Sequence, residues 1–216
     1  MPNPKHILIA DDHGVVRYGI MLLVKDLFPH TEITQVGTFG DALRTVENKL
    51  VDLVILDINI PGGNNIQMLE MLAQKQKGIK VLVFSAYDEN LYAVRYLQAG
   101  AKGYLHKQNS DQEIKFAINT VLSRGKYMSQ DVKDILINNS LNNNNEGNPI
   151  KILSNREFEV AQMLISGYGI TEISNLLALQ MSTVSTYKNR IFEKMSVDNI
   201  VQLIDKFRFW NTAETN

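Results

Sequence analysis

The sequence predicts an α/β part with a five-stranded, doubly wound parallel sheet, followed by a small all-α part of four helices, in a chain of 216 residues. Three observations predict this organisation. Short apolar runs alternate with helix-like segments in the first half, which is typical of parallel β/α units. A polar, asparagine-rich tract then interrupts the chain. Beyond the tract, apolar residues recur at helical spacing.

Each predicted strand is a run of four to six mainly apolar residues, as expected for strands buried in a parallel sheet. We expect strands near His6–Ala10, Ile33–Val36, Leu53–Asp57, Lys80–Ser85 and Lys102–His106. The intervening helices are expected near Val15–Phe28, Asp41–Asn48, Ile66–Gln76, Asn90–Ala99 and Asp111–Arg124. Ser110 and Glu113 have the spacing of a capping box, which predicts the start of the fifth helix.

Four of these strands end in residues that handle a phosphate or a divalent metal. Because the carboxyl ends of parallel strands meet at one edge of the sheet, we expect these side chains to lie together. They are Asp11 and Asp12, Asp57, Ser85 and Lys107. Any one of them alone is more typical of a turn, a helix cap or a solvated loop. Together, they suit the binding of Mg²⁺ beside a carboxylate that accepts a phosphoryl group.

Composition excludes several classes of site. The chain has no cysteine, which rules out disulfides, thiolate metal sites and thiol nucleophiles. His13 follows the acidic pair, but without a second well-spaced histidine we do not expect it to bind metal. No apolar run is long enough to span a bilayer, and the first residues lack a signal peptide pattern. We expect a soluble, cytoplasmic protein with no membrane partner.

The polar tract predicts the domain boundaries. Residues 127–149 are expected to form a flexible, asparagine-rich linker between a first domain, 1–126, and a second, 150–216. A brief helix near Asp131–Ile137 is compatible with this expectation. In the second domain, Ser154 and Glu157 form another capping box, opening a helix that runs to Gly167. Further helices are expected near Ile170–Leu177, Ser182–Met195 and Asn199–Phe209.

Two short helices joined by a tight turn suggest a helix-turn-helix, whose second helix enters the DNA major groove. Along Ser182–Met195, one side is apolar, formed by Val184, Tyr187, Ile191 and Met195. Small and hydrogen-bonding residues line the opposite side, with cations on the flanks: Ser182, Ser185, Thr186, Asn189, Lys188, Arg190 and Lys194. A solvated surface helix would show the same pattern. The net charge of −1 decides nothing between these interpretations.

The first half resembles the receiver domain of bacterial two-component response regulators, a flavodoxin-like fold. The resemblance depends on Asp11-Asp12, Asp57 followed by Pro61-Gly62, Ser85-Ala86, Tyr104 and Lys107. The second half resembles the LuxR-type helix-turn-helix, through Leu153–Glu157 with Glu159-Val160, Glu172-Ile173, Thr183–Lys188, Ile191 and Lys194-Met195. The two halves occur in the order typical of the NarL/FixJ family.

The resemblance implies a role for each residue at the sheet edge. Asp57 is the expected phosphoacceptor, taking a phosphoryl group from a sensor histidine kinase. Mg²⁺ is the expected cofactor, bound by Asp12, Asp57 and the backbone carbonyl of Asn59, with Asp11 acting partly through water. Lys107 is expected to neutralise phosphoryl oxygens. These roles make the protein a regulator rather than an enzyme.

The resemblance also implies an output. Ser85 is expected to hydrogen-bond the phosphoryl group, and Tyr104 then to turn inward, which promotes homodimerisation and binding of double-stranded promoter DNA. RNA polymerase is a further partner implied by the family. We expect Ser185, Thr186 and Asn189 to read bases and the flanking cations to bind phosphates. Ser182 and Thr183 complete the expected set.

Two alternatives stay open. The protein is a DNA-binding regulator that works without phosphorylation, or, less favoured, an aspartyl-phosphate phosphotransferase enzyme. Haloacid-dehalogenase phosphatases place a second aspartate two residues after the first, where this chain has Asn59. The DNA-binding half also departs from the family pattern at Gln180, Ser185 and Tyr187-Lys188, which leaves the preferred DNA sequence open.

Overall fold

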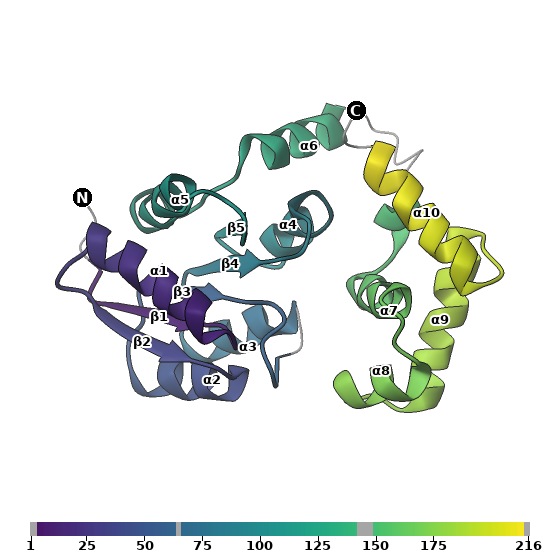
Figure 1. Cartoon of the computed structure of the whole chain (residues 1–216), viewed down its shortest axis with the longest axis horizontal. Coiled ribbons are helices and arrows are strands. Elements are labelled where there is room, and N and C mark those ends of the chain that lie inside the picture. The colour runs from purple at the N-terminus through teal and green to yellow at the C-terminus, as the bar shows by residue number, and fades with distance from the viewer. Residues whose placement is uncertain (1–3, 64–65, 142–148, 214–216) are drawn as a thin grey trace. The chain divides into compact units, whose positions relative to one another are not determined.

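The computed structural model describes residues 4–63, 66–141 and 149–213, and the chain divides into two compact units, residues 1–138 and 139–216 (Figure 1). Each unit is described by itself. The longest asparagine run, which we expect within the linker, lies in 142–148, outside the described residues.

The first unit contains a five-stranded, all-parallel sheet with the strand order β2-β1-β3-β4-β5. The strands are β1 (His6–Ala10), β2 (Glu32–Val36), β3 (Leu53–Leu56), β4 (Val81–Ser85) and β5 (Gly103–His106). All residues of β1, β3 and β4 are buried, because helices cover both faces of the sheet. The predicted fold class is confirmed.

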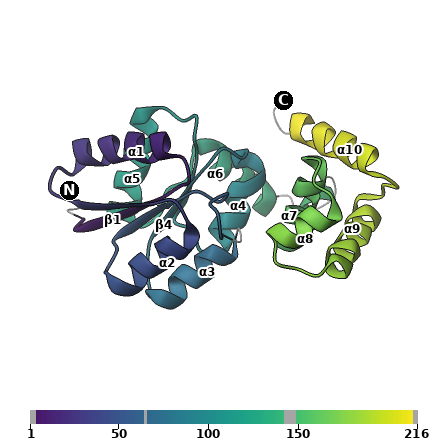
Figure 2. The same ribbon diagram turned by 60° about the horizontal axis from the view of Figure 1, so that its bottom comes forward.

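Helices α1 and α5 cover one face of the sheet, and α2 and α3 lie on the other (Figure 2). The helices of this part are α1 (Gly14–Leu27), α2 (Phe39–Asn48), α3 (Gln67–Lys75), α4 (Glu89–Gln98) and α5 (Asp111–Arg124). The Ser110 hydroxyl accepts the Glu113 amide at 3.3 Å, as the capping pattern predicts. Gly125 ends α5 in the left-handed region, with φ 82°.

Successive residues of each strand point to opposite faces, so each strand contributes to two cores. Ile7 and Ile9 pack in the core that includes Val24 of α1 and Ile118 of α5. Leu8, between them, belongs to the opposite face and is fully buried as well. This double burial fixes the register of the strands, because a shift by one residue would exchange the two faces.

An additional helix, α6 (Gln130–Leu141), occupies the first part of the predicted linker and is longer than the brief helix we allowed there. The segment that leads into α6 is anchored to the first unit. The Tyr127 amide donates to the Lys102 carbonyl at 2.7 Å, and the Tyr127 ring is buried. Val132, in the first turn of α6, is only 1% exposed. The boundaries 1–126, 127–149 and 150–216 stay a prediction.

The second unit is helical, as predicted. It contains a short 3-10 turn, η1 (Pro149–Ile152), and the helices α7 (Asn155–Ile165), α8 (Ile170–Leu176), α9 (Met181–Met195) and α10 (Ile200–Ala213). Ser154 and Glu157 form the complete predicted capping box at the start of α7. Phe158 of α7 packs against Phe207 of α10, with ring centroids 6.2 Å apart.

The turn between α8 and α9 depends on a residue in the left-handed region. Ala178 has φ 51°, and the amide of Leu179 donates to the Ser174 carbonyl at 2.9 Å. This bond closes the end of α8 and lets α9 start after a short connection. Among the residues that the structure describes, no helix is long and apolar enough to cross a membrane.

Candidate functional site

The predicted site residues of the first unit meet at the carboxyl edge of the sheet. The register pairs Ala10 with Leu56, so the residues after these two strands emerge side by side. The Asp57 amide donates to the Ala10 carbonyl at 2.8 Å, which extends the pairing by one residue. On the other side, the Lys107 amide donates to the carbonyl of Ser85 at 2.7 Å. The sheet geometry therefore brings the expected residues together.

Asp57 is buried at this edge, with 3% of its surface exposed. Its Oδ2 accepts a hydrogen bond from Lys107 Nζ at 2.8 Å, and its Oδ1 accepts from the Asn59 amide at 3.1 Å. Burial raises the pKa of Asp57 above its ordinary value, although these two hydrogen bonds act in the opposite direction. The hydrogen bonds from Lys107 and Asn59 therefore do not fully compensate the cost of burying the charged carboxylate of Asp57.

Lys107 bridges two buried carboxylates. Its Nζ lies 2.6 Å from Asp11 Oδ2 and 2.8 Å from Asp57 Oδ2. Burial alone would lower the pKa of Lys107, but the bonds to the two carboxylates outweigh it and the pKa lies above its ordinary value. The ammonium therefore stays charged at neutral pH. One cation shared by two acids leaves negative charge at the edge, which a divalent metal would neutralise.

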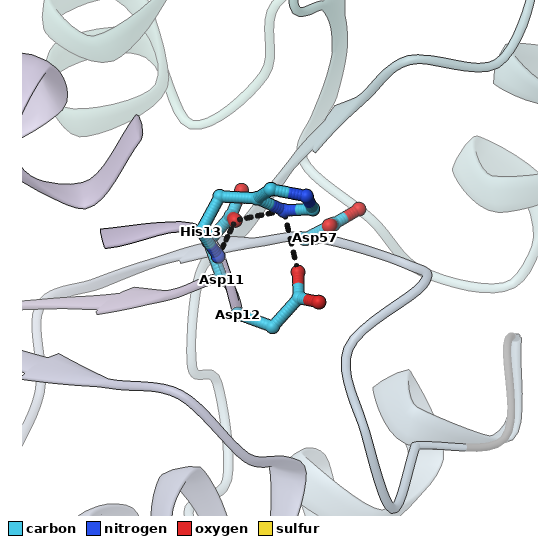
Figure 3. Close-up of side chains that lie close together, drawn as sticks. All are labelled: Asp11, Asp12, His13 and Asp57. Carbon is cyan, nitrogen blue, oxygen red and sulfur yellow. Dashed lines mark hydrogen bonds and ion pairs between the residues drawn. The ribbon is translucent and has the colours of Figure 1, made fainter. Parts of the chain in front are cut away.

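The acidic side chains form a potential metal site. Ligand atoms of Asp11, Asp12, His13 and Asp57 all lie within 4.8 Å of one another (Figure 3). Asp11 and Asp57 are buried, whereas Asp12 is 35% exposed and so faces solvent, from which a metal would arrive. Hard carboxylate oxygens and an open side suit Mg²⁺, which keeps several waters. The cluster thus fits the predicted cofactor, and His13 joins it although sequence analysis set this residue aside.

Ser85 ends β4, and Tyr104 lies in the neighbouring strand β5; both are 1% exposed. The Ser85 hydroxyl accepts the Tyr87 amide at 3.1 Å, and the Tyr104 hydroxyl donates to the Tyr87 carbonyl at 2.9 Å. The Tyr104 ring also packs against Tyr96 of α4, with centroids 6.0 Å apart. Burial raises the pKa of Tyr104, so its hydroxyl stays a donor. The ring predicted to turn inward is already inside in this structure.

Helix α9 separates its faces as the sequence predicts. Val184, Ile191 and Met195 are 0% exposed, so this side of α9 faces the core of the second unit. Tyr187, expected on the same side, is only half-buried. On the other side, Ser182, Thr186, Asn189, Arg190 and Lys194 are exposed, and Thr183, Ser185 and Lys188 are half-buried. The structure therefore presents the predicted DNA-binding residues on an accessible surface.

Two cations of this set have partners within the second unit. Lys194 Nζ lies 2.7 Å from Glu157 Oε2, a carboxylate at the start of α7 that is nearly buried. Burial tends to raise the pKa of Glu157, but the bonds from Lys194 and Ser154 outweigh it and the pKa is lowered. Lys188 Nζ lies 5.3 Å from the centre of the Phe192 ring. Lys194 therefore has a structural role that the sequence pattern did not indicate.

Comparison with known families agrees with this geometry. Residues 7–119 match the response regulator receiver domain, and residues 151–207 match the bacterial regulatory proteins of the luxR family. The first match contains the whole acidic edge, and the second contains α7, α8 and α9. The fold and the site therefore define a receiver joined to a helix-turn-helix.

Relatives match this chain over most of their own length. The response regulator GacA of Pseudomonas aeruginosa is 32% identical over 197 residues, which cover 91% of this chain and 92% of the relative. The response regulator UvrY of Escherichia coli K12 is 29% identical over 198 residues, covering 92% and 91%. The Fimbriae Z protein of Escherichia coli K12 is 31% identical over 203 residues, covering 94% and 96%.

Solved structures agree on the fold. The RcsB response regulator of Salmonella typhimurium superposes with a TM-score of 0.74 at 22% identity, over 95% of this chain and 96% of that chain. The chain belongs to the NarL/FixJ family of two-component response regulators, with a receiver domain and a LuxR-type DNA-binding domain. It is accordingly a DNA-binding transcription regulator and not an enzyme.

Proposed function

We propose that phosphorylation of Asp57 by a sensor histidine kinase, dependent on Mg²⁺, switches this regulator between a weakly and a strongly DNA-binding state. One observation carries the proposal. Asp57 is buried at the sheet edge, with Lys107 on one of its oxygens and further acidic ligands within 4.8 Å. A buried carboxylate whose charge is incompletely compensated is suited to react and to bind a metal.

The transfer itself needs positioning more than covalent chemistry. A carboxylate oxygen of Asp57 attacks the phosphorus of the kinase phosphohistidine, the P–N bond breaks, and the histidine nitrogen leaves with the bonding electrons. Lys107 pairs with negative charge that develops on the phosphoryl oxygens. The residues that would hold Mg²⁺ are Asp11, Asp12, Asp57 and the Asn59 carbonyl. The bound ion supplies charge neutralisation and orients the phosphoryl oxygens.

The modified Asp57 then acts on the neighbouring switch residues. The Ser85 hydroxyl, now engaged with the Tyr87 amide, becomes a donor to a phosphoryl oxygen. Because Ser85 also accepts from the Tyr87 amide, its reorientation pulls on the loop whose Tyr87 carbonyl accepts from Tyr104, and Tyr104 packs on Tyr96 of α4. The change therefore reaches the surface of α4 and β5 and biases an existing equilibrium between two receiver states.

The output is paired binding to promoter DNA in the cytoplasm. Dimerisation of the phosphorylated chain places two α9 helices on related half-sites, and a linker over 127–149 sets how far apart these are. RcsB from Salmonella enterica serovar Typhimurium, whose fold this chain shares, is known bound to a promoter with the phosphomimetic BeF3⁻. RNA polymerase is the further partner at the promoter.

Within α9, the exposed polar side chains are the proposed base readers, above all Ser185, Thr186 and Asn189. Ser182 and Thr183 lie at the start of the helix, where contacts to the DNA backbone are common. Lys188 and Arg190 are the proposed phosphate contacts. Lys194 contributes less than the sequence suggests while it pairs with Glu157.

The experiment is intact-mass measurement after incubation with acetyl phosphate and Mg²⁺. We expect wild type to gain the mass of one phosphoryl group, and Asp57→Asn or wild type with a chelator to gain none. A phosphoryl group retained on Asp57→Asn would place the acceptor elsewhere and overturn the proposal.

A further inference from the structure

The imidazole of His13 lies among the acidic side chains, although the sequence alone does not predict that this residue binds metal (Figure 3). Its Nδ1 is 2.7 Å from Asp12 Oδ1 and 3.3 Å from Asp11 Oδ1. His13 is the N-cap residue of α1, yet its side chain makes no capping hydrogen bond. The ring is therefore directed at the carboxylates and does not close the helix end.

The backbone holds the ring in this place. The His13 amide donates to Asp11 Oδ1 at 2.8 Å, so the residue is tied to the same carboxylate that its side chain approaches. The first turn of α1 follows at once from Gly14, which limits how far the residue can move. Asp11 is itself fixed, since it is buried and paired with Lys107.

We propose that His13 is a nitrogen ligand through which this acidic site takes a borderline transition metal, of the Zn²⁺, Co²⁺ and Ni²⁺ class, in competition with Mg²⁺. The proposal rests on the proposed function, because it concerns the same acidic site. Carboxylates alone favour hard ions such as Mg²⁺, whereas an added imidazole favours zinc, cobalt and nickel.

The spacing of the donor atoms supports this assignment. With metal–ligand bonds of about 2.1 Å, neighbouring ligand atoms lie about 3.0 Å apart in an octahedral site and about 3.4 Å apart in a tetrahedral one. The His13 nitrogen is 2.7 and 3.3 Å from its two carboxylate oxygens, so these two nitrogen–oxygen distances need to change by only a few tenths of an ångström. Neutral imidazole would then share an ion with Asp12 in place of a hydrogen bond.

The carboxylate oxygens are divided between two nitrogen-bearing side chains. His13 faces the Oδ1 atoms of Asp11 and Asp12, while Lys107 faces the Oδ2 atoms of Asp11 and Asp57. A transition metal on the His13 side therefore leaves the Lys107 bridge in place. It does, however, occupy Asp12, which the proposed Mg²⁺ site needs, so the two metals exclude each other.

The test is calorimetric titration of the tag-free full chain with Zn²⁺ and, separately, with Mg²⁺. We expect His13→Gln to weaken Zn²⁺ binding by about tenfold or more and Mg²⁺ binding far less, because glutamine offers no borderline nitrogen ligand. His30→Gln is the matched control: His30 is an exposed histidine between α1 and β2, and its replacement should change neither affinity.

A second readout identifies the ligand atom directly. With Co²⁺ as a paramagnetic stand-in, the His13 ring protons should show strongly shifted NMR resonances that are lost in His13→Gln and kept in His30→Gln. Equal Zn²⁺ affinities of wild type and His13→Gln, or equal losses for Zn²⁺ and Mg²⁺, would overturn the inference. Absence of a phosphoryl group on wild type with Mg²⁺ would instead count against the proposed function alone.

Discussion

Replacement of Lys107 by methionine should be strongly destabilising, because it leaves two buried carboxylates without their shared cation. Asp11 and Asp57 are 2% and 3% exposed, and neither has another cationic side chain as deeply placed as Lys107 among the described residues. At an effective dielectric constant of about 20, an ion pair at the 2.8 Å separation of Lys107 and Asp57 has a Coulomb energy of about 6 kcal/mol.

Part of that energy offsets the desolvation of the three groups, so the net effect is smaller. Removal of one partner from a buried pair typically costs about 3–5 kcal/mol. Methionine keeps the length and the apolar stem of the side chain, which restricts the change to the charge. We therefore expect Lys107→Met to lower the free energy of unfolding of the first unit by about 3 kcal/mol or more at neutral pH.

The assay is urea denaturation followed by far-UV circular dichroism, with a chelator present so that no divalent ion replaces the ammonium. The single tryptophan, Trp210, lies in α10, so its fluorescence reports the second unit and should not change. Lys115→Met is the matched control: Lys115 pairs with the exposed Asp26 at 2.5 Å, and its loss should cost about 1 kcal/mol at most. Equal losses for the two variants would refute the reasoning.

Three further predictions concern the rest of the chain. Ala178→Gly should raise the stability of the second unit by about 0.5–1 kcal/mol, since glycine removes the cost of a left-handed alanine at φ 51°; a lower tryptophan-monitored midpoint would contradict this. Lys188→Ala should weaken binding to all DNA and reduce the salt slope by about 0.9, whereas Asn189→Ala should mainly reduce discrimination between specific and random DNA. Equal loss on both DNAs after Asn189→Ala would count against its role. Because burial raises the pKa of Asp57 in the fold, its carboxyl binds more protons folded than unfolded, and stability falls as pH rises through the interval between the two pKa values. Asp57→Asn should therefore be more stable than wild type at neutral pH without metal, and this gain should shrink in acid; urea midpoints across pH check it.

Much of the receiver follows from the sequence, because its strongest constraint is local. Buried parallel strands are short apolar runs, and the residue after each run must emerge at one edge of the sheet. That is why Asp57 and Lys107 are predictable neighbours although they lie 50 positions apart. The helix limits also follow from local signals, such as the Ser154–Glu157 capping box and the left-handed Gly125.

The features that escaped prediction depend on tertiary contacts. A brief helix near Asp131–Ile137 is compatible with the sequence, but the full length of α6 is not expected, because the burial of Val132 that anchors its start leaves no periodic pattern in this polar segment. Lys194 pairs with Glu157, which lies 37 residues earlier in the chain. Because the two residues are far apart in the sequence, the pattern of α9 predicted only a phosphate contact for Lys194 and not this ion pair. The orientation of His13 depends on its amide bond to Asp11, which residue spacing does not reveal.

The central claim is that the state of Asp57 governs DNA binding by α9. Its most direct measurement is the affinity of the full chain for a promoter fragment recovered by genome-wide mapping, at one fixed salt concentration. The account predicts tighter, dimeric binding after treatment of wild type with acetyl phosphate and Mg²⁺, and no response in Asp57→Asn. Identical affinities before and after a treatment that mass measurement shows to modify Asp57 would contradict it.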